Sequence, residues 1–217
     1  MKFGLVVEGK DDAALIAACV QGELARLGLG LPSFEQLQPP LDATGQIESG
    51  GWAKVLGWII NYSGSSLETF FVPLFSSNTA CDAIIVHLDS DIHADLLKNL
   101  ASPPVKDPSN FEDLVNHLEI ELRKALNCPK YDGKVCFAIP VHKSENWIMA
   151  GSPVCQDSRW SDEDAKRVIR TLFDSANHIS ISDMINKMIS DISLSTDNLY
   201  SRAISYRPFR DKFEKSL

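Results

Sequence analysis

No CxxC pair, no long apolar run and no excess of basic residues occurs in this chain of 217 residues. The five cysteines are scattered along it, which argues against both a structural zinc site and a disulfide framework. No apolar run reaches the roughly 18 residues that span a bilayer, and the apolar stretch at the N-terminus is too short for a signal peptide. We therefore expect a protein of the reducing cytoplasm without a membrane-spanning segment.

Motifs of several enzyme classes are also missing. The sequence contains no GxSxG nucleophile elbow, no Walker A loop and no Rossmann glycine fingerprint. Its 21 basic and 29 acidic residues give a formal net charge of −8, which argues against coating of nucleic acid by charge alone. An enzyme that acts on phosphodiesters is compatible with this charge, because bound metal ions offset a site built from carboxylates.

Three apolar runs are typical of fully buried strands. The clearest is DAIIVHLDSD, an aliphatic and β-branched run that ends in acidic residues. The segment 28–50 is rich in Gly and Pro, and we expect at most one further short strand in it. The three apolar runs occupy residues 3–8, 82–91 and 134–141.

Helical patterns separate these strands. The clearest helix covers 108–127, where Ser109 and Glu112 have the spacing of a capping box. Strands that alternate with helices predict an α/β fold, with a mostly parallel, Rossmann-like sheet flanked by helices. We expect 1–150 to form this domain and 151–217 to form a helical C-terminal extension packed on it. Other helices are expected at 11–27, 51–60, 66–75, 144–150, 161–173 and 182–192.

Carboxylates follow each of the three predicted strands. Glu8 ends the first, Asp89 and Asp91 end the second, and Glu145 follows the third by a few residues. Asp12, four residues after Glu8, can point back toward the same edge. Ligands of parallel α/β sheets bind at the carboxyl ends of the strands, where these groups meet. Converging carboxylates repel one another unless a divalent ion neutralises them, and hard oxygen ligands suit Mg²⁺ or Mn²⁺.

Each acid taken alone has an ordinary explanation. Acids in the first turn of a helix complement its dipole, and a DxD sequence is common in turns. The shared edge of the sheet is what favours a metal site. Among the histidines, we expect His87 to be a satisfied residue of the core or of a strand face, while His93 and His142 lack the spacing of metal ligands.

At motif level, residues 1–150 resemble a Toprim domain, the catalytic module of topoisomerases, bacterial primases and OLD-family nucleases. VVEGKDD resembles the strand-end glutamate motif of that family, and IIVHLDSD resembles its DxD motif. The EGxxD spacing, the segment IPVHKSENWIMAG and the helical tail are similar to small, stand-alone OLD-like proteins of bacteria. The glycine pair at 50–51 falls where such domains carry a turn after the second strand.

The resemblance implies a Toprim nuclease that uses Mg²⁺ or Mn²⁺ to hydrolyse phosphodiesters. Two ions about 4 Å apart would activate a water and steady the leaving oxygen. Glu8, Asp12 and Asp89 are implied as ligands of one ion. Asp89 or Asp91, together with Glu145, is implied as the ligand set of the other.

Two lysines are candidates for the basic residue of such a site. Lys143 would stabilise the charge that develops on the scissile phosphate, and Lys10 is the other candidate. The four tyrosines lie outside the motifs, so hydrolysis by water is favoured over strand passage through a tyrosine nucleophile. The implied catalytic residues are Glu8, Asp89, Asp91 and Lys143.

The family analogy also implies partners. It favours DNA over RNA as the substrate, in defence against phage, and an ATPase encoded on a separate chain; a homodimer is left open. We expect Arg207 and Arg210, in the basic C-terminal tail, to contact nucleic acid together with Lys10. Phe209 and Phe213 would anchor this helix and leave Arg210 outside. The alternative for the tail is an amphipathic helix that only closes the core.

Two other functions fit parts of the pattern. A non-catalytic regulatory subunit could use the same fold to bind a metal or a partner, because a fold does not fix an activity. A nucleotide-sugar glycosyltransferase could use the DxD motif to hold Mn²⁺ and a diphosphate. The second alternative leaves Glu8, Asp12 and Glu145 without a role.

Overall fold

The computed structural model describes residues 1–217 apart from 42, 44–49, 73–79, 152–186 and 188–194. Within the described residues, four parallel strands form one sheet in the order β2-β1-β3-β4. The helices expected at 161–173 and 182–192 fall outside the described residues, Lys187 excepted. The strands are β1 (Lys2–Val6), β2 (Ser33–Gln38), β3 (Ala83–His87) and β4 (Val135–Ala138).

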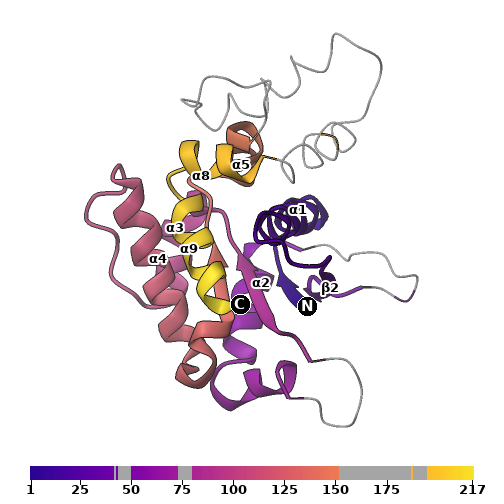
Figure 1. The fold of residues 1–217 in the computed structure, drawn as a ribbon. Coiled ribbons are helices and arrows are strands. Elements are labelled where there is room, and N and C mark those ends of the chain that lie inside the picture. The colour runs from indigo at the N-terminus through magenta and orange to yellow at the C-terminus, as the bar shows by residue number, and fades with distance from the viewer. Residues whose placement is uncertain (42, 44–49, 73–79, 152–186, 188–194) are drawn as a thin grey trace.

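Helices cover both faces of this sheet, which confirms the expected α/β fold (Figure 1). No helix in the described part of the chain combines the length and apolar character needed to cross a bilayer. The α-helices are α1 (Lys10–Arg26), α2 (Trp52–Asn61), α3 (His93–Asn99), α4 (Phe111–Leu126), α5 (Ser144–Gly151), α8 (Thr196–Arg202) and α9 (Tyr206–Ser216). The 3-10 helices are η1 (Gly64–Phe70), η2 (Ser90–Ile92) and η3 (Pro129–Lys134).

Strands β1, β3 and β4 are buried on both faces, because neighbouring residues of a strand point to opposite sides and helices cover each side of the sheet. The edge strand β2 is only partly buried. Phe3 and Ile85 belong to one core, which contains residues of α1, α5, α8 and α9. Ile84 and Val86 belong to the other core, with residues of α2, α3 and α4. This is why β1, β3 and β4 have continuous apolar sequences instead of an alternating pattern, whereas the edge strand β2, with the sequence SFEQLQ, does not.

The three strands predicted at 3–8, 82–91 and 134–141 are neighbours in the sheet. β3 pairs with β1 on one side and with β4 on the other, and all three run parallel. Val6 is in register with Val86, and His87 is in register with Ala138. The segments that follow these residues therefore leave the sheet at the same edge.

The strand predicted at 82–91, which is β3, is shorter than expected. β3 ends at His87, so the DxD pair Asp89 and Asp91 lies in the exit from the strand and in η2. The segment expected as a helix at 66–75 begins earlier, as the 3-10 helix η1, and its residues from 73 lie outside the description.

The capping box expected for α4 is wrong. The N-cap is Asn110, whose side-chain oxygen accepts a hydrogen bond from the Asp113 backbone N–H at 3.3 Å. Ser109 instead donates its hydroxyl to Asp107 at 2.5 Å. Asparagine caps a helix as well as serine does, so sequence spacing alone left two neighbouring candidates.

The last helices share the core of the sheet. Phe209 and Phe213 of α9 are buried, as expected, and the ring centroids of Phe3 and Phe213 lie 5.6 Å apart. Trp147 of α5 donates its indole N–H to the Ser205 hydroxyl at 2.9 Å. Figure 1 shows α8 and α9 in yellow tones beside α5 and the sheet. Residues of α8 and α9 thus belong to the same core as residues of β1 and α1. The division of the chain at residue 150 stays a prediction.

Candidate metal centre

Glu8 lies two residues beyond β1, where the chain crosses from the strand to α1. Its Oε1 accepts a hydrogen bond from the Asp89 backbone N–H at 2.9 Å. Its carbonyl oxygen accepts another from the Gly51 N–H at 2.7 Å. A Cβ on Gly50 would lie only 1.7 Å from that same carbonyl oxygen, so no other residue fits there without movement. The glycine pair thus allows the connection before α2 to reach Glu8.

Ser144 joins two of the other carboxylates. Its backbone N–H donates to Asp89 Oδ1 at 2.8 Å, and its hydroxyl donates to Asp12 Oδ1 at 2.8 Å. Ser144 begins α5, so the first turn of this helix holds Asp89, from the exit of β3, and Asp12, from α1, in one place. Asp12 therefore points back to the edge of the sheet, as the sequence predicted.

Asp91 lies on the outer side of this group. The Lys143 ammonium is 3.1 Å from Asp91 Oδ2, and this contact raises the pKa of Lys143. The backbone N–H of Asp91 also donates to the His142 carbonyl at 3.1 Å. The DxD loop and the loop after β4 are thereby tied together, with one positive charge at the rim of the acidic group.

These residues surround a small pocket of about 210 Å³. Glu145, which is 9% exposed, contributes to its wall. Asp12, Asp89 and Glu145 line this pocket, whereas Glu8 and Asp91 lie outside its lining and interact electrostatically with Asp89. The described lining contains no tyrosine. The pocket is lined by Asp11, Asp12, Asp89, Lys143, Ser144, Glu145 and Ile148.

The crowding of carboxylates changes their acidity. Burial raises the pKa of Asp89 from 3.8 to about 9, and repulsion from Asp12, Glu8, Glu145 and Asp91 adds to the effect. Burial also raises the pKa of Glu8 from 4.5 to about 7, although the hydrogen bond from the Asp89 N–H opposes it. Both carboxyl groups therefore resist ionisation in the protein without a bound cation.

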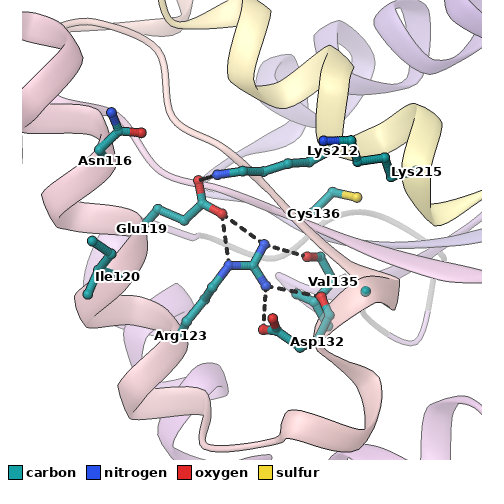
Figure 2. Close-up of a pocket in the computed structure, with 10 residues that line it drawn as sticks. Asn116, Glu119, Ile120, Arg123, Asp132, Val135, Cys136, Lys212 and Lys215 are labelled. Atoms are coloured by element: carbon teal, nitrogen blue, oxygen red, sulfur yellow. Dashed lines mark hydrogen bonds and ion pairs between the residues drawn. The ribbon is translucent and has the colours of Figure 1, made fainter.

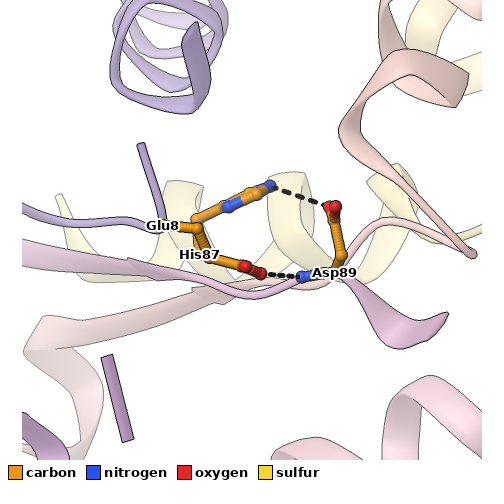
Figure 3. A group of neighbouring side chains, drawn as sticks. All are labelled: Glu8, His87 and Asp89. Carbon is orange, nitrogen blue, oxygen red and sulfur yellow. Dashed lines mark hydrogen bonds and ion pairs between the residues drawn. The ribbon is translucent and has the colours of Figure 1, made fainter. Parts of the chain in front are cut away.

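His87 joins this group from the end of β3, and the expectation that it is a satisfied core residue is wrong. Its side chain is fully buried, yet neither ring nitrogen has a hydrogen-bond partner among the described residues. Nε2 lies 3.6 Å from Asp89 Oδ1, too far for a hydrogen bond (Figure 3). Burial lowers the pKa of His87, against the attraction of Asp12 and Glu145. The imidazole is thus directed at the carboxylates without being satisfied by them.

A divalent cation fits this donor set. One ligand atom each from Glu8, His87 and Asp89 lie within 4.8 Å of one another. A cation there would oppose the rise in the carboxyl pKa values, because its charge stabilises the ionised carboxylates, and would give His87 Nε2 a partner. Asp12, Asp91 and Glu145 lie around this trio, and their assignment as metal ligands stays a prediction.

A larger pocket of about 440 Å³ lies elsewhere, beside the edge strand β4 (Figure 2). Most of its charges are paired: the buried Glu119 accepts from Arg123 Nε at 2.8 Å and also pairs with Lys212. Arg123 further donates to Asp132 at 2.6 Å and to the Val135 carbonyl at 3.1 Å. These contacts cover the open edge of the sheet, so we assign the pocket a structural role.

The C-terminal helix differs from expectation in its basic residues. Arg210 is not on the outside: it is 8% exposed, and its guanidinium lies 3.2 Å from Glu23 and 3.0 Å from Asp197. Arg207 is exposed, but donates to the carbonyl groups of Tyr200 and Ser201, each at 2.9 Å. The contact of Arg207 and of the exposed Lys10 with nucleic acid stays a prediction.

Sequence reasoning missed two residues of the site, His87 and Ser144. Both left a signal. His87 is a polar residue inside an otherwise aliphatic run, two positions before Asp89. Ser144 is a good hydrogen-bonding residue at the start of a helix that follows a strand.

Comparisons with known proteins add no family to this description. A scan against protein-family models, a search of curated proteins and a search of solved structures each gave no significant match. Any function therefore has to be argued from the residues of the site.

Proposed function

We propose that this protein is a divalent-metal-dependent nuclease that hydrolyses phosphodiesters, with a Toprim-type arrangement of carboxylates. The observation that carries the proposal is the meeting of Glu8 and Asp89 in one hydrogen-bonded group at the carboxyl edge of a parallel sheet. Asp12, Asp91 and Glu145 surround it, and a pocket opens beside it. Carboxylates from separate strands meet in this way where a cation holds them, because they otherwise repel one another.

The residues of the site have different roles in the proposed reaction. A bound divalent ion supplies Lewis acidity and makes water a stronger nucleophile. Glu8 and Asp89 offer oxygen ligands, and Ser144 keeps Asp89 and Asp12 in position. Lys143, held at the rim by Asp91, would stabilise a negatively charged phosphate. Water attacks phosphorus, the ester oxygen leaves, and a phosphate monoester and a hydroxyl are the products.

Nucleic acid is the proposed substrate, with DNA favoured by the resemblance of the motifs. A protein with a formal net charge of −8 needs local positive charge or a metal to receive a phosphate. Lys143 supplies such charge at the pocket, and Lys10 lies at the start of α1, between Glu8 and Asp12 in the sequence. An ATPase on a separate chain, a second copy of the protein and a role in phage defence remain proposals that follow from the resemblance.

The test is a cleavage assay with end-labelled single-stranded DNA, duplex DNA and RNA, each with Mg²⁺, Mn²⁺ or excess EDTA. We expect cleavage that depends on the metal and that falls about 100-fold or more in Asp89→Asn. The amide retains an oxygen acceptor for the Ser144 N–H but removes the charge that binds a cation.

Asp95→Asn is the matched control, because Asp95 is an exposed acid on α3 that lines neither pocket described above. Its activity should equal that of the unchanged protein. If the protein binds metal but cleaves none of the three substrates, the nuclease proposal is wrong and the non-catalytic alternative replaces it. Equal activity in Asp89→Asn would place the reaction elsewhere in the molecule.

A further inference from the structure

We propose that His87 is a metal ligand, and that Glu8, His87 and Asp89 form a mixed nitrogen–oxygen site that selects Mn²⁺ over Mg²⁺. The inference rests on the metal-binding part of the proposed function, but not on the reaction. It changes the expected chemistry of the site, since carboxylates alone would make an all-oxygen site that suits Mg²⁺ equally well.

The position of the imidazole is the first argument. His87 is the last residue of β3, and its register partner on β4 is Ala138. It belongs to the same face of the strand as Ala83 and Ile85, because side chains alternate along a strand. An aliphatic residue would complete that face, yet the chain has a histidine there, next to Asp89 (Figure 3).

The missing partners are the second argument. A buried polar group is almost always hydrogen-bonded, because leaving it unpaired costs free energy. Within the described residues, both ring nitrogens of His87 lack a partner although the side chain is 0% exposed. A metal ion between Nε2 and the carboxylates would use the lone pair of that nitrogen. Nε2 would then have a partner in the loaded protein and none in the empty one.

The distances are the third argument. Donors bonded to one ion at about 2.0–2.2 Å lie at most about 4.4 Å apart. Nε2 of His87 is 3.6 Å from Asp89 Oδ1, and the ligand atoms of Glu8, His87 and Asp89 all lie within 4.8 Å of one another. The separation of His87 Nε2 and Asp89 Oδ1 lies inside this limit, and the trio is near enough for its side chains to move toward a shared ion.

The identity of the metal follows from the nitrogen. Imidazole is a good ligand for first-row transition ions, whereas Mg²⁺ prefers oxygen and keeps several of its waters. One histidine and two carboxylates therefore favour Mn²⁺ and its neighbours in the series over Mg²⁺. Three protein ligands also leave coordination positions open for water or a phosphate oxygen.

The experiment is pulsed electron paramagnetic resonance on the full chain loaded with one equivalent of Mn²⁺. We expect modulation from a directly coordinated ¹⁴N nucleus, together with Mn²⁺ binding that an approximately 100-fold excess of Mg²⁺ does not displace. In His87→Gln the nitrogen signal should disappear and Mn²⁺ affinity should fall about 10-fold or more, with a smaller change for Mg²⁺.

His117→Gln is the matched control, because it removes an imidazole that hydrogen-bonds to the Pro103 carbonyl, apart from the trio. The nitrogen signal should persist in this variant. Circular dichroism establishes that His87→Gln is folded; if it is not, the spectrum of the unchanged protein decides. Bound Mn²⁺ without nitrogen coupling, or a signal that survives in folded His87→Gln, would overturn the inference.

The outcome is separable from that of the proposed function. Nitrogen-coupled Mn²⁺ in a protein that cleaves no substrate would leave this inference standing and remove the nuclease. Cleavage supported by Mg²⁺ in a protein whose bound Mn²⁺ shows no nitrogen coupling would do the opposite.

Discussion

At the scale of single residues, the placement of Glu8 depends on a residue far from it in the sequence. Gly50 has space for no side chain, since a Cβ there would overlap the Glu8 carbonyl oxygen and lie 2.8 Å from its carbon. The next residue, Gly51, has a positive φ of 111° and donates its N–H to that carbonyl. The segment before α2 thus holds the backbone of Glu8. This contact fixes the direction of the Glu8 carboxylate.

Gly50→Ala should therefore disturb the metal centre. We expect a loss of about 1–3 kcal/mol in the free energy of unfolding, because the chain must move away from Glu8 and break the hydrogen bond from Gly51. Mn²⁺ affinity should fall with it. Urea denaturation in EDTA and calorimetric titration with Mn²⁺ measure the two effects.

Gly57→Ala is the matched control for this prediction. Gly57 lies inside α2, and a Cβ there meets nothing within 4 Å. The substitution should raise stability by about 0.5–1 kcal/mol, because alanine favours a helix over glycine. If Gly50→Ala behaves like Gly57→Ala, the close approach to Glu8 has no energetic consequence.

At the scale of elements, α9 is tied to α1 by a buried network of charges. Glu23 of α1 is fully buried and accepts a hydrogen bond from the Tyr206 hydroxyl at 2.9 Å. Arg26 contacts the same carboxylate at 2.8 Å, and Arg210 contacts it at 3.2 Å. The basic residue that the sequence placed on the outer face thus neutralises an acid inside the protein.

Arg210→Met should destabilise the protein. We expect a loss of about 2–4 kcal/mol in the free energy of unfolding, because Glu23 loses one of its charge partners while it stays buried. Lys215→Met, on the exposed face of the same helix, should change stability by less than about 0.5 kcal/mol. Equal effects of the two substitutions, measured by urea denaturation, would show that Arg210 has no structural role.

At the scale of the whole molecule, the carboxylates of the site couple stability to pH and to metal. The pKa values of Glu8 and Asp89 are about 7 and about 9 in the folded protein, against 4.5 and 3.8 ordinarily. Each group binds its proton more tightly when the protein is folded. The metal-free fold is therefore favoured at low pH by these two groups, and loses that advantage as pH rises from about 4 to about 9.

The unfolding midpoint in EDTA should accordingly be lower at pH 8 than at pH 5.5. Asp89→Asn should flatten this difference, because an amide does not ionise. Mn²⁺ should stabilise the protein more at pH 8 than at pH 5.5, because the ion displaces protons. At a concentration about 100 times its Kd, the total stabilisation by Mn²⁺ should be about 2.7 kcal/mol. A midpoint in EDTA that rises from pH 5.5 to pH 8 would contradict the raised pKa values.

The sequence by itself determined the class of fold and the edge at which the acids gather. Continuous apolar runs between helical patterns indicated a parallel sheet covered on both faces, and parallel strands bring their carboxyl ends to one edge. Glu8 and Asp89 follow two such runs, so local patterns were sufficient to expect them near each other. Phe209 and Phe213, four residues apart, likewise indicated the buried face of α9.

Only the tertiary structure decided which polar residues are buried and what they meet. His87 and Arg210 are the examples: both are polar residues in local patterns that indicated an ordinary role, and both are buried against charged groups. Glu23 is distant from Arg210 in the chain, and the burial of His87 depends on elements packed around β3, so no local period contains that information. Burial and pairing are properties of packed elements, because a polar group gains or loses free energy according to what replaces its water.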